Sequence, residues 1–500
     1  MRKNLLWYGA SPLPGIIDRL EARGFQVVEN PSREHIDDPL LGASRIVVIN
    51  HEDAWSDALG QPYAHLKKFI DHGLRILVVA ERSLWSDIRQ NRLESIDAAF
   101  PWDDAVRFME DWRGISFDNV SSYVPSAPWK HVHLLTDESF EGLTEEEVCL
   151  VCRAFPKAEQ VKLIEIRKGM SGSRVFMAHE KRRKDAASIS YWTQPRLVKI
   201  GSRTSMVEEV AAMRDVSPFV PFELRPNLDA HVEGFHKALF VADFVDRSEP
   251  MIEAARAGRA EEALSNLFNR TLGQWRSRGG LTQGPSESFA SAAKRLGIVW
   301  LEAILPEYTA SELFESAGID LTSTWAQLGG ISFPHRSATI HGDLHGENVR
   351  VRGHDAVIID FGSVKGNDKP GYGAPLSFDV AMLEVALVFD GNTRDDEASF
   401  DQSKWQQDIE RWYRFGAQHK VHIDLEPGNG EWLPGCLSRI RAFAIYEQSD
   451  PREYPLALAI AMLRLCKFPP RTLADKRRRL AGLMIAQRLI RDMHSRTGAS

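Results

Sequence analysis

Three side chains suited to metal binding and proton transfer lie within one strand-like stretch, "TIHGDLHGENVRVRGHDAVIIDFGS", at residues 339–363. They are Asp343, Asn348 and Asp360. "NVRVR" and "AVIID" are strand-like, and "GHD" between them is a turn signal, so the stretch predicts a β-hairpin. If the hairpin is centred on His354, Asn348 and Asp360 face each other at its open end.

An amide oxygen beside a carboxylate suits Mg²⁺, which takes few protein oxygens together with phosphate oxygens. Asp343, in the loop before the hairpin, is placed to accept a proton from an attacking hydroxyl. One base, one amide ligand and one carboxylate ligand are the set that phosphoryl transfer from a metal–nucleotide complex requires. The alternative is a surface hairpin with incidental acids, and the complete set at this spacing argues against it.

The motifs in this stretch resemble those of the protein-kinase-like superfamily. "HGDLHGEN" is similar to the HGDxHxxN of the aminoglycoside phosphotransferase and choline kinase branch, whereas protein kinases have HRDxKxxN. Gly342 and His345 match the small-molecule branch. The resemblance implies that Asp343 is the catalytic base and that Asn348 and Asp360 hold magnesium.

A second motif agrees with the first. Asp379, in "LSFDVAMLEVAL", resembles the acidic residue with which the branch opens a helix, and no APE triplet of a protein-kinase activation segment follows. The resemblance covers about residues 145–495. It implies an α+β bilobal protein-kinase-like domain that uses ATP and Mg and phosphorylates the hydroxyl of a small molecule.

Upstream, "KGMSGSRVF" lies between two strand-like segments and resembles a phosphate-covering loop. Gly169 and Gly172 permit a tight turn, and Ser171 and Ser173 offer donors to phosphate oxygens. An ordinary hairpin turn is the alternative, and the order of the segments favours the phosphate loop. The chain contains no GxxxxGK[ST] motif, so this is not a P-loop.

A lysine and a glutamate that would complete a nucleotide site follow. Lys199 in "PRLVKIG" resembles the strand lysine of kinases that contacts the α- and β-phosphates. Its acidic partner is Glu208 or Glu209 on the next helix, "SMVEEVAAM". Helical periodicity turns Val210 and Met213 inward, so Glu209, which lies beside that face, is preferred.

The elements before this region have a different pattern. Residues 4 to about 112 repeat a helix–Gly–strand unit with continuous apolar strands, which predicts a doubly wound parallel sheet of the receiver or flavodoxin-like type. The first and third strand ends, "YGAS" and Asn50, lack the carboxylates of a phosphate-accepting receiver. We therefore expect an α/β domain for docking or sensing, with a possible protein partner.

These patterns divide the chain into four parts: the α/β domain at 1–125, a Ser- and Pro-rich linker at 126–142, a kinase-like N-lobe at 143–246 and a mostly helical C-lobe at 247–500. A chain of 500 residues is too long for one compact core.

The composition limits the possible partners and the cellular location of the protein. The net charge of −7 argues against a nucleic-acid partner. Four cysteines make no disulfide framework, so a cytoplasmic protein is expected, and Cys149 and Cys152 are interpreted as buried helix thiols rather than a redox or zinc pair. No apolar run suits a membrane span; the longest, "PLALAIAMLRLC", is broken by Arg464.

The leading hypothesis is an ATP- and Mg-dependent phosphotransferase acting on a small-molecule hydroxyl, with the N-terminal domain for regulation or partner docking. The acceptor is open among aminoglycosides, choline-like alcohols, sugars, nucleosides and protein, and the acidic balance mildly favours a cationic small molecule. The alternative is an ATP-binding regulatory, pseudokinase-like module, or a protein-phosphorylating module of a multi-component bacterial system.

Overall fold

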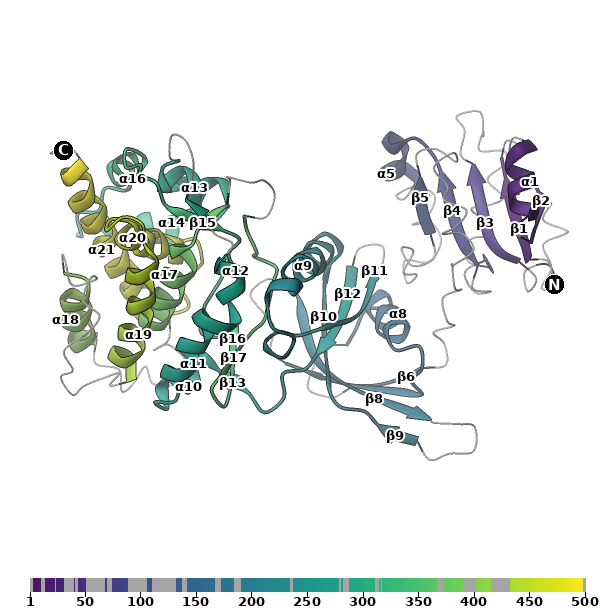
Figure 1. Ribbon diagram of the computed structural model, residues 1–500, viewed down its shortest axis with the longest axis horizontal. Coiled ribbons are helices and arrows are strands. Elements are labelled where there is room, and N and C mark those ends of the chain that lie inside the picture. The colour runs from purple at the N-terminus through teal and green to yellow at the C-terminus, as the bar shows by residue number, and fades with distance from the viewer. Residues whose placement is uncertain are drawn as a thin grey trace. The chain divides into compact units, whose positions relative to one another are not determined.

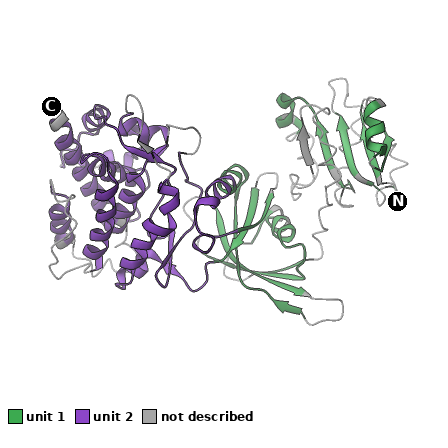
Figure 2. Cartoon of the chain, in the orientation of Figure 1, with its two compact units in different colours: residues 1–210, 228–244 green, residues 211–227, 245–500 purple. Residues whose placement is uncertain are grey.

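The structure is a computed structural model in which the chain forms an N-terminal parallel sheet, a second, mostly antiparallel sheet and a mostly helical C-terminal part (Figure 1). The described residues are 3–9, 14–22, 24–30, 40, 44–50, 68–69, 74–88, 106–109, 132–136, 142–166, 172–183, 190–233, 237–277, 280–281, 287–310, 314–315, 317–366, 373–390, 402–414 and 432–497. The chain divides into two compact units, residues 1–210 with 228–244 and residues 211–227 with 245–500 (Figure 2).

The N-terminal sheet is parallel throughout and has the strand order β2-β1-β3-β4-β5. Its strands are β1 (Lys3–Tyr8), β2 (Phe25–Glu29), β3 (Ser44–Asn50), β4 (Arg75–Val79) and β5 (Val106–Met109). Successive side chains pack into two separate cores, with Leu6 and Val47 in one and Leu5 and Val48 in the other. Both faces are therefore buried, as continuous apolar strands predict for a parallel sheet.

The second sheet has the order β11-β12-β10-β8-β7-β6, with β9 paired to β8. Its strands are β6 (His133–Thr136), β7 (Gln160–Glu165), β8 (Arg174–Arg183), β9 (Ser190–Trp192), β10 (Arg196–Ser202), β11 (Leu228–Glu233) and β12 (Lys237–Asp243). All pairs are antiparallel except β6 with β7. The linker prediction for 126–142 is thus wrong at residues 133–136, because "HLLT" completes the edge of this sheet.

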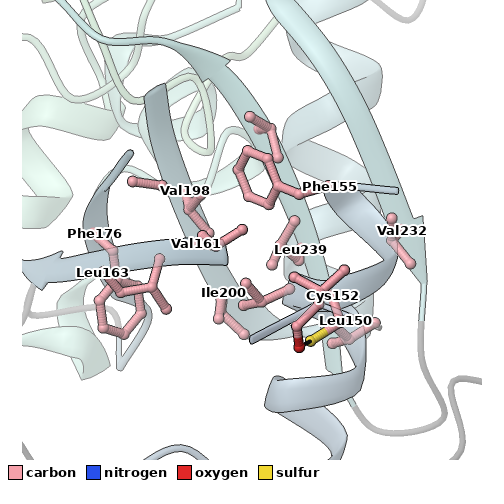
Figure 3. Close-up of a cluster of buried hydrophobic side chains, with 14 of the residues drawn as sticks. Leu150, Cys152, Phe155, Val161, Leu163, Phe176, Val198, Ile200, Val232 and Leu239 are labelled. Atoms are coloured by element: carbon pink, nitrogen blue, oxygen red, sulfur yellow. Dashed lines mark hydrogen bonds between the residues drawn. The ribbon is translucent and has the colours of Figure 1, made fainter. Parts of the chain in front are cut away.

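Helix α8 (Glu145–Ala154) covers this sheet and begins after its N-cap residue, Thr144. Thr144 accepts the Glu147 backbone N–H, and the Glu147 carboxylate accepts the Thr144 N–H in return. Leu150 and Cys152 pack with the sheet residues around Phe176 (Figure 3). Burial raises the pKa of the Cys152 thiol to about 11, which fits the predicted buried thiol; the Cys149 side chain lies outside the described residues.

The second unit is mostly helical, as the sequence predicts for the C-lobe (Figure 1). Its longer helices are α16 (Leu321–Gly329), α17 (Ser377–Val385), α18 (Gln402–Trp412), α19 (Trp432–Glu447), α20 (Glu453–Leu465) and α21 (Leu473–Thr497). The first helices, α10 (Met251–Arg256) and α11 (Ala260–Asn266), follow β13 (Glu249–Pro250), which forms a small sheet with β16 (Val349–Arg352) and β17 (Asp355–Ile358).

A buried ion pair joins three of these helices. The Arg441 guanidinium on α19 donates to the Glu384 carboxylate on α17, with Nη2 2.7 Å from Oε1. Tyr454 Oη on α20 donates to the second oxygen at 2.6 Å. Because each charge has a partner, the pair is tolerated in the core and fixes how α17, α19 and α20 pack. In the part of the chain that the structure describes, no helix is long and apolar enough to cross a membrane.

Candidate active site

The motif "HGDLHGEN", residues 341–348, which we call the catalytic loop, lies between β15 (Arg336–Ala338) and β16, and Asp379 holds its backbone in place. Asp379 stands in the first turn of α17 and is buried. Its Oδ2 accepts the His341 N–H at 2.8 Å, and its Oδ1 accepts the Gly342 N–H at 2.9 Å. The acidic residue recognised in the sequence therefore fixes the two residues that precede Asp343.

Gly342 lets this loop lie directly against the segment after Asp360. Its φ is +76°, and a Cβ placed there would overlap the Ser363 carbonyl oxygen. Beside it, Ile340 and Lys365 exchange backbone hydrogen bonds of 2.9 and 3.1 Å. Only glycine satisfies both the left-handed backbone and the close approach.

His341 is fully buried, and its side chain holds the loop against neighbouring segments. Its Nε2 lies 3.0 Å from the Ile359 carbonyl oxygen, so Nε2 carries the proton and donates it. Its ring also contacts Phe361, with 6.1 Å between ring centroids. These contacts join the loop to the end of the β16–β17 hairpin.

Asp343 is paired with a positive charge that the motif does not contain. Arg464 Nη2 lies 2.6 Å from Asp343 Oδ1, and His345 Nε2 lies 3.7 Å from Oδ2. His345 Nδ1 accepts the Glu347 N–H at 3.2 Å, which leaves the ring proton on the nitrogen that faces Asp343. Burial by itself would raise the pKa of Asp343, but the His345 contact and the Arg464 charge outweigh it and hold the pKa well below its usual range.

Asn348 is oriented for the role of an oxygen ligand. Its Nδ2 donates to the Asp343 carbonyl oxygen at 3.0 Å, which turns the amide oxygen away from this bond. Asp360 is exposed and has a φ of +61°, a left-handed conformation that is unusual for a non-glycine residue and common at functional sites. An amide oxygen and an accessible carboxylate fit a magnesium ion that also takes phosphate oxygens.

The hairpin itself is present, but its predicted register is wrong by one residue. Val349 pairs with Ile358 and Arg352 with Asp355, so the two-residue turn is Gly353-His354 rather than a turn centred on His354. Gly353 has a φ of +63°, which a tight two-residue hairpin turn favours at its first position. Asn348 consequently lies opposite Ile359, whose N–H donates to the Asn348 carbonyl at 2.9 Å, and Asp360 follows it.

The predicted lysine and glutamate meet in the other compact unit. Lys199 Nζ on β10 lies 3.0 Å and 2.9 Å from the two carboxylate oxygens of Glu209 on α9 (Arg203–Val216), and both side chains are buried. Glu208 is exposed, because the inward face of α9 consists of Met206, Val210 and Met213. In the structure, as predicted, Glu209 rather than Glu208 is therefore the partner of Lys199.

The predicted phosphate loop is described only in part. Gly172 has a φ of +73°, and Ser173 is buried beside Gly201 of β10, where an added Cβ would lie 2.7 Å from Ser173 Oγ. Gly169 and Ser171 lie outside the described residues. The described end of the loop thus leads into β8, whose Val175 pairs with Lys199.

Arg464 was not predicted to be a site residue. In the sequence it served only as evidence against a membrane span. Every other residue of α20 is buried, so a lone arginine in the apolar run at residues 455–465 was the available signal. A buried or half-buried charge needs a partner, and here the partner is Asp343.

No protein-family model matches the chain, and no curated protein matches it in sequence. The solved structures that are similar to the chain include three of aminoglycoside phosphotransferases. They are aminoglycoside-3'-phosphotransferase of type VIII (15% identity, 56% of this chain and 93% of that chain, TM-score 0.30), APH(3'')-Id from Streptomyces rimosus (18%, 56% and 92%, 0.29) and a thermostable mutant of APH(4)-Ia (11%, 68% and 95%, 0.32).

These neighbours are named for the same family that the catalytic-loop motif resembles.

Proposed function

We propose that the protein is an ATP- and Mg-dependent phosphotransferase that moves the γ-phosphate to a hydroxyl of a small molecule. One observation carries the proposal. A single buried loop ties the ionised Asp343 to Asn348 through the 3.0 Å amide–carbonyl bond, and Asp360 follows the residue opposite Asn348. Base, amide and carboxylate are the parts that phosphoryl transfer needs.

Each residue has a distinct role in this proposal. Asp343 orients the acceptor hydroxyl and takes its proton, and its lowered pKa keeps it ionised at neutral pH. Asn348 and Asp360 would hold the metal, and the bound magnesium nucleotide supplies the phosphoryl group. Catalysis on this basis comes mainly from positioning and charge stabilisation.

The nucleotide phosphates would be bound in the first unit. Lys199, fixed by Glu209, would contact them with its ammonium. The loop with Gly169, Ser171, Gly172 and Ser173 would donate to their oxygens. A lysine held by a carboxylate is a recurrent feature of kinase-like nucleotide sites.

The N-terminal domain would have a docking or regulatory role. Its strand order, 2-1-3-4-5, is that of doubly wound flavodoxin-like and receiver folds. We propose residues 1–125 as this domain, with a protein partner, and 143–246 and 247–500 as the two lobes of the kinase-like domain. The three cysteines described as free and buried favour the reducing cytoplasm.

Transfer of label from γ-labelled ATP with magnesium tests the proposal. Wild type, Asp343→Asn, Asp360→Ala and Asp355→Asn would be compared with a metabolite extract and an aminoglycoside panel. Asp355 is the matched control, because it lies at the hairpin tip and pairs with Arg270 on the surface. We expect label on a small molecule with wild type and Asp355→Asn only.

Three other results would change the assignment. Label on protein favours the protein-phosphorylating alternative. ATP binding without any transfer favours the regulatory module and contradicts the proposed activity. Transfer by Asp343→Asn at the wild-type rate would show that Asp343 is not the base.

A further inference from the structure

Three cations lie on segments next to the loop that carries Asp343, and we call Arg464, Lys467 and Lys365 the cationic cluster. Arg464 contacts Asp343 Oδ1 at 2.6 Å and lies over the Phe468 ring, 5.2 Å from its centroid. Lys467 follows one turn later on the same side of the chain, where the Arg464 carbonyl accepts its N–H. Lys365 belongs to the segment that pairs with Ile340 beside the catalytic loop.

The cluster carries more positive charge than its surroundings neutralise. Within the described part of the chain, Arg464 has one carboxylate partner, Asp343, and neither Lys365 nor Lys467 is paired with a carboxylate. Lys467 Nζ instead donates to the Gly297 carbonyl at 2.9 Å and lies 4.7 Å from the centre of the Trp300 ring.

The cations also act on one another. Burial lowers the pKa of Lys467, and the charges of Arg464 and Lys365 lower it further, while Asp343 raises it. Two other acids border Asp343: Asp379 accepts two backbone N–H groups, and the charge of Glu347 acts on Arg350. Asp360 is the proposed metal ligand, so its charge would be taken up by the cation it binds.

From this geometry we infer that the acceptor is an anionic hydroxyl compound, whose carboxylate or phosphate group is bound by Arg464 and Lys467. The inference rests on the proposed function, because it assumes that the acceptor hydroxyl comes to Asp343. An anionic group offers Arg464 a new partner and frees Asp343 Oδ1 to accept the hydroxyl proton. A cationic acceptor, such as an amino sugar, would instead meet two like charges beside the base.

The positive charge beside Asp343 therefore favours an anionic acceptor, whereas the net charge of the whole chain favours a cationic one. A net charge of −7 favours a cationic small molecule only if the pocket has the same sign as the chain. Beside Asp343 the sign is positive. Arginine also suits this role because its planar guanidinium forms paired hydrogen bonds with carboxylates and phosphates.

Fractionated acceptors provide the first test. A small-molecule cell extract is separated on anion and cation exchangers, and each fraction is incubated with full-length protein, magnesium and γ-labelled ATP. Glycerate, glycerol 3-phosphate, glycerol and 3-amino-1,2-propanediol serve as defined probes of matched size. We expect transfer with the fraction held by the anion exchanger.

The outcomes separate this inference from the proposed function. Acceptor activity in the cation-exchanger or unbound fraction overturns the inference and leaves the phosphotransferase intact. No transfer in any fraction, with magnesium ATP still bound, overturns both. Phosphatase treatment before the assay separates the two anion sources, because it destroys a phosphate acceptor and spares a carboxylate acceptor.

Variants of Arg464 and Lys467 provide the second test, with the active fraction as acceptor. Arg464→Gln should raise the acceptor KM about 10- to 100-fold, the range for loss of a charged hydrogen bond, with the KM for ATP unchanged. Lys467→Gln should give a smaller rise, and Arg464→Lys should recover part of the loss. Arg491→Gln, an exposed arginine on α21, is the matched control.

A purely structural role for Arg464 predicts a different pattern. If it only positions Asp343, Arg464→Gln lowers kcat and leaves the acceptor KM unchanged, and that result refutes anion binding. An unchanged acceptor KM in Lys467→Gln as well as Arg464→Lys refutes it too, without depending on the more disruptive variant.

Discussion

Gly342→Ala should damage both the fold and the activity of the helical unit far more than a matched glycine substitution elsewhere. Gly342 has a φ of +76°, and its added Cβ would overlap the backbone carbonyl oxygen of Ser363. Gly353, at the hairpin turn, has a similar φ of +63°, but nothing lies within 4 Å of its added Cβ. The pair therefore separates the cost of the left-handed backbone from the cost of the clash.

The magnitudes follow from these two terms. A left-handed backbone costs an alanine about 1–2 kcal/mol, and both variants carry this cost. Overpacking against a neighbour that cannot move away adds about 1–3 kcal/mol for Gly342→Ala alone. We expect Gly353→Ala to lose about 1–2 kcal/mol of stability and Gly342→Ala about 2–5 kcal/mol.

Urea unfolding midpoints and γ-phosphate transfer rates would measure the two effects. The clash displaces the loop from Ser363 and disturbs the N–H groups that Asp379 accepts, so transfer should fall sharply in Gly342→Ala and stay near wild type in Gly353→Ala. Equal stability and equal transfer in the two variants would refute the claim that close packing requires glycine at 342.

Three further outcomes are expected. Glu209→Gln should weaken ATP binding about tenfold or more by removing the charge that fixes Lys199, whereas Glu208→Gln, on the exposed side of α9, should bind ATP like wild type in a titration. Burial raises the pKa of Glu453 from 4.5 to about 7, so the folded state binds the proton more tightly; stability should fall as the pH rises from about 4.5 to about 7, by at most about 3 kcal/mol. Glu453→Gln should flatten that slope in urea titrations at several pH values, and a slope unchanged from wild type would contradict the assignment. Arg441→Leu should cost about 3–5 kcal/mol, because it leaves a fully buried carboxylate on α17 without its partner, and a loss below 1 kcal/mol would show that the pair is dispensable.

Much of the site could be predicted because its parts lie close together in sequence. Asp343, Asn348 and Asp360 are joined by one loop and one hairpin, so their spacing nearly fixes their geometry. Hydrophobic patterning likewise predicted the parallel N-terminal sheet and the helix that carries Cys152, which is α8. In each case the information is local, since side-chain periodicity and turn chemistry act over a few residues.

Features that depend on one or a few residues were harder to predict. The hairpin register slipped by one residue because the turn is set by the backbone at Gly353, which the letters "GHD" do not specify. Strand β6 was not predicted because the sequence before it is rich in Ser and Pro and was interpreted as a linker. A four-residue edge strand also has almost no hydrophobic pattern of its own. Glu208 and Glu209 differ by one step around a helix, so only the packing of α9 decides which carboxylate reaches Lys199.

The sequence by itself determined which residues have the chemistry for phosphoryl transfer and in what order they come along the chain. The tertiary structure alone decided the charge around Asp343, the proposed base. Arg464 lies 121 residues after Asp343, and their contact exists because α20 packs its single, mostly buried arginine toward the catalytic loop. No local pattern encodes such a contact, because it depends on how the helices of the second unit pack around their buried charges.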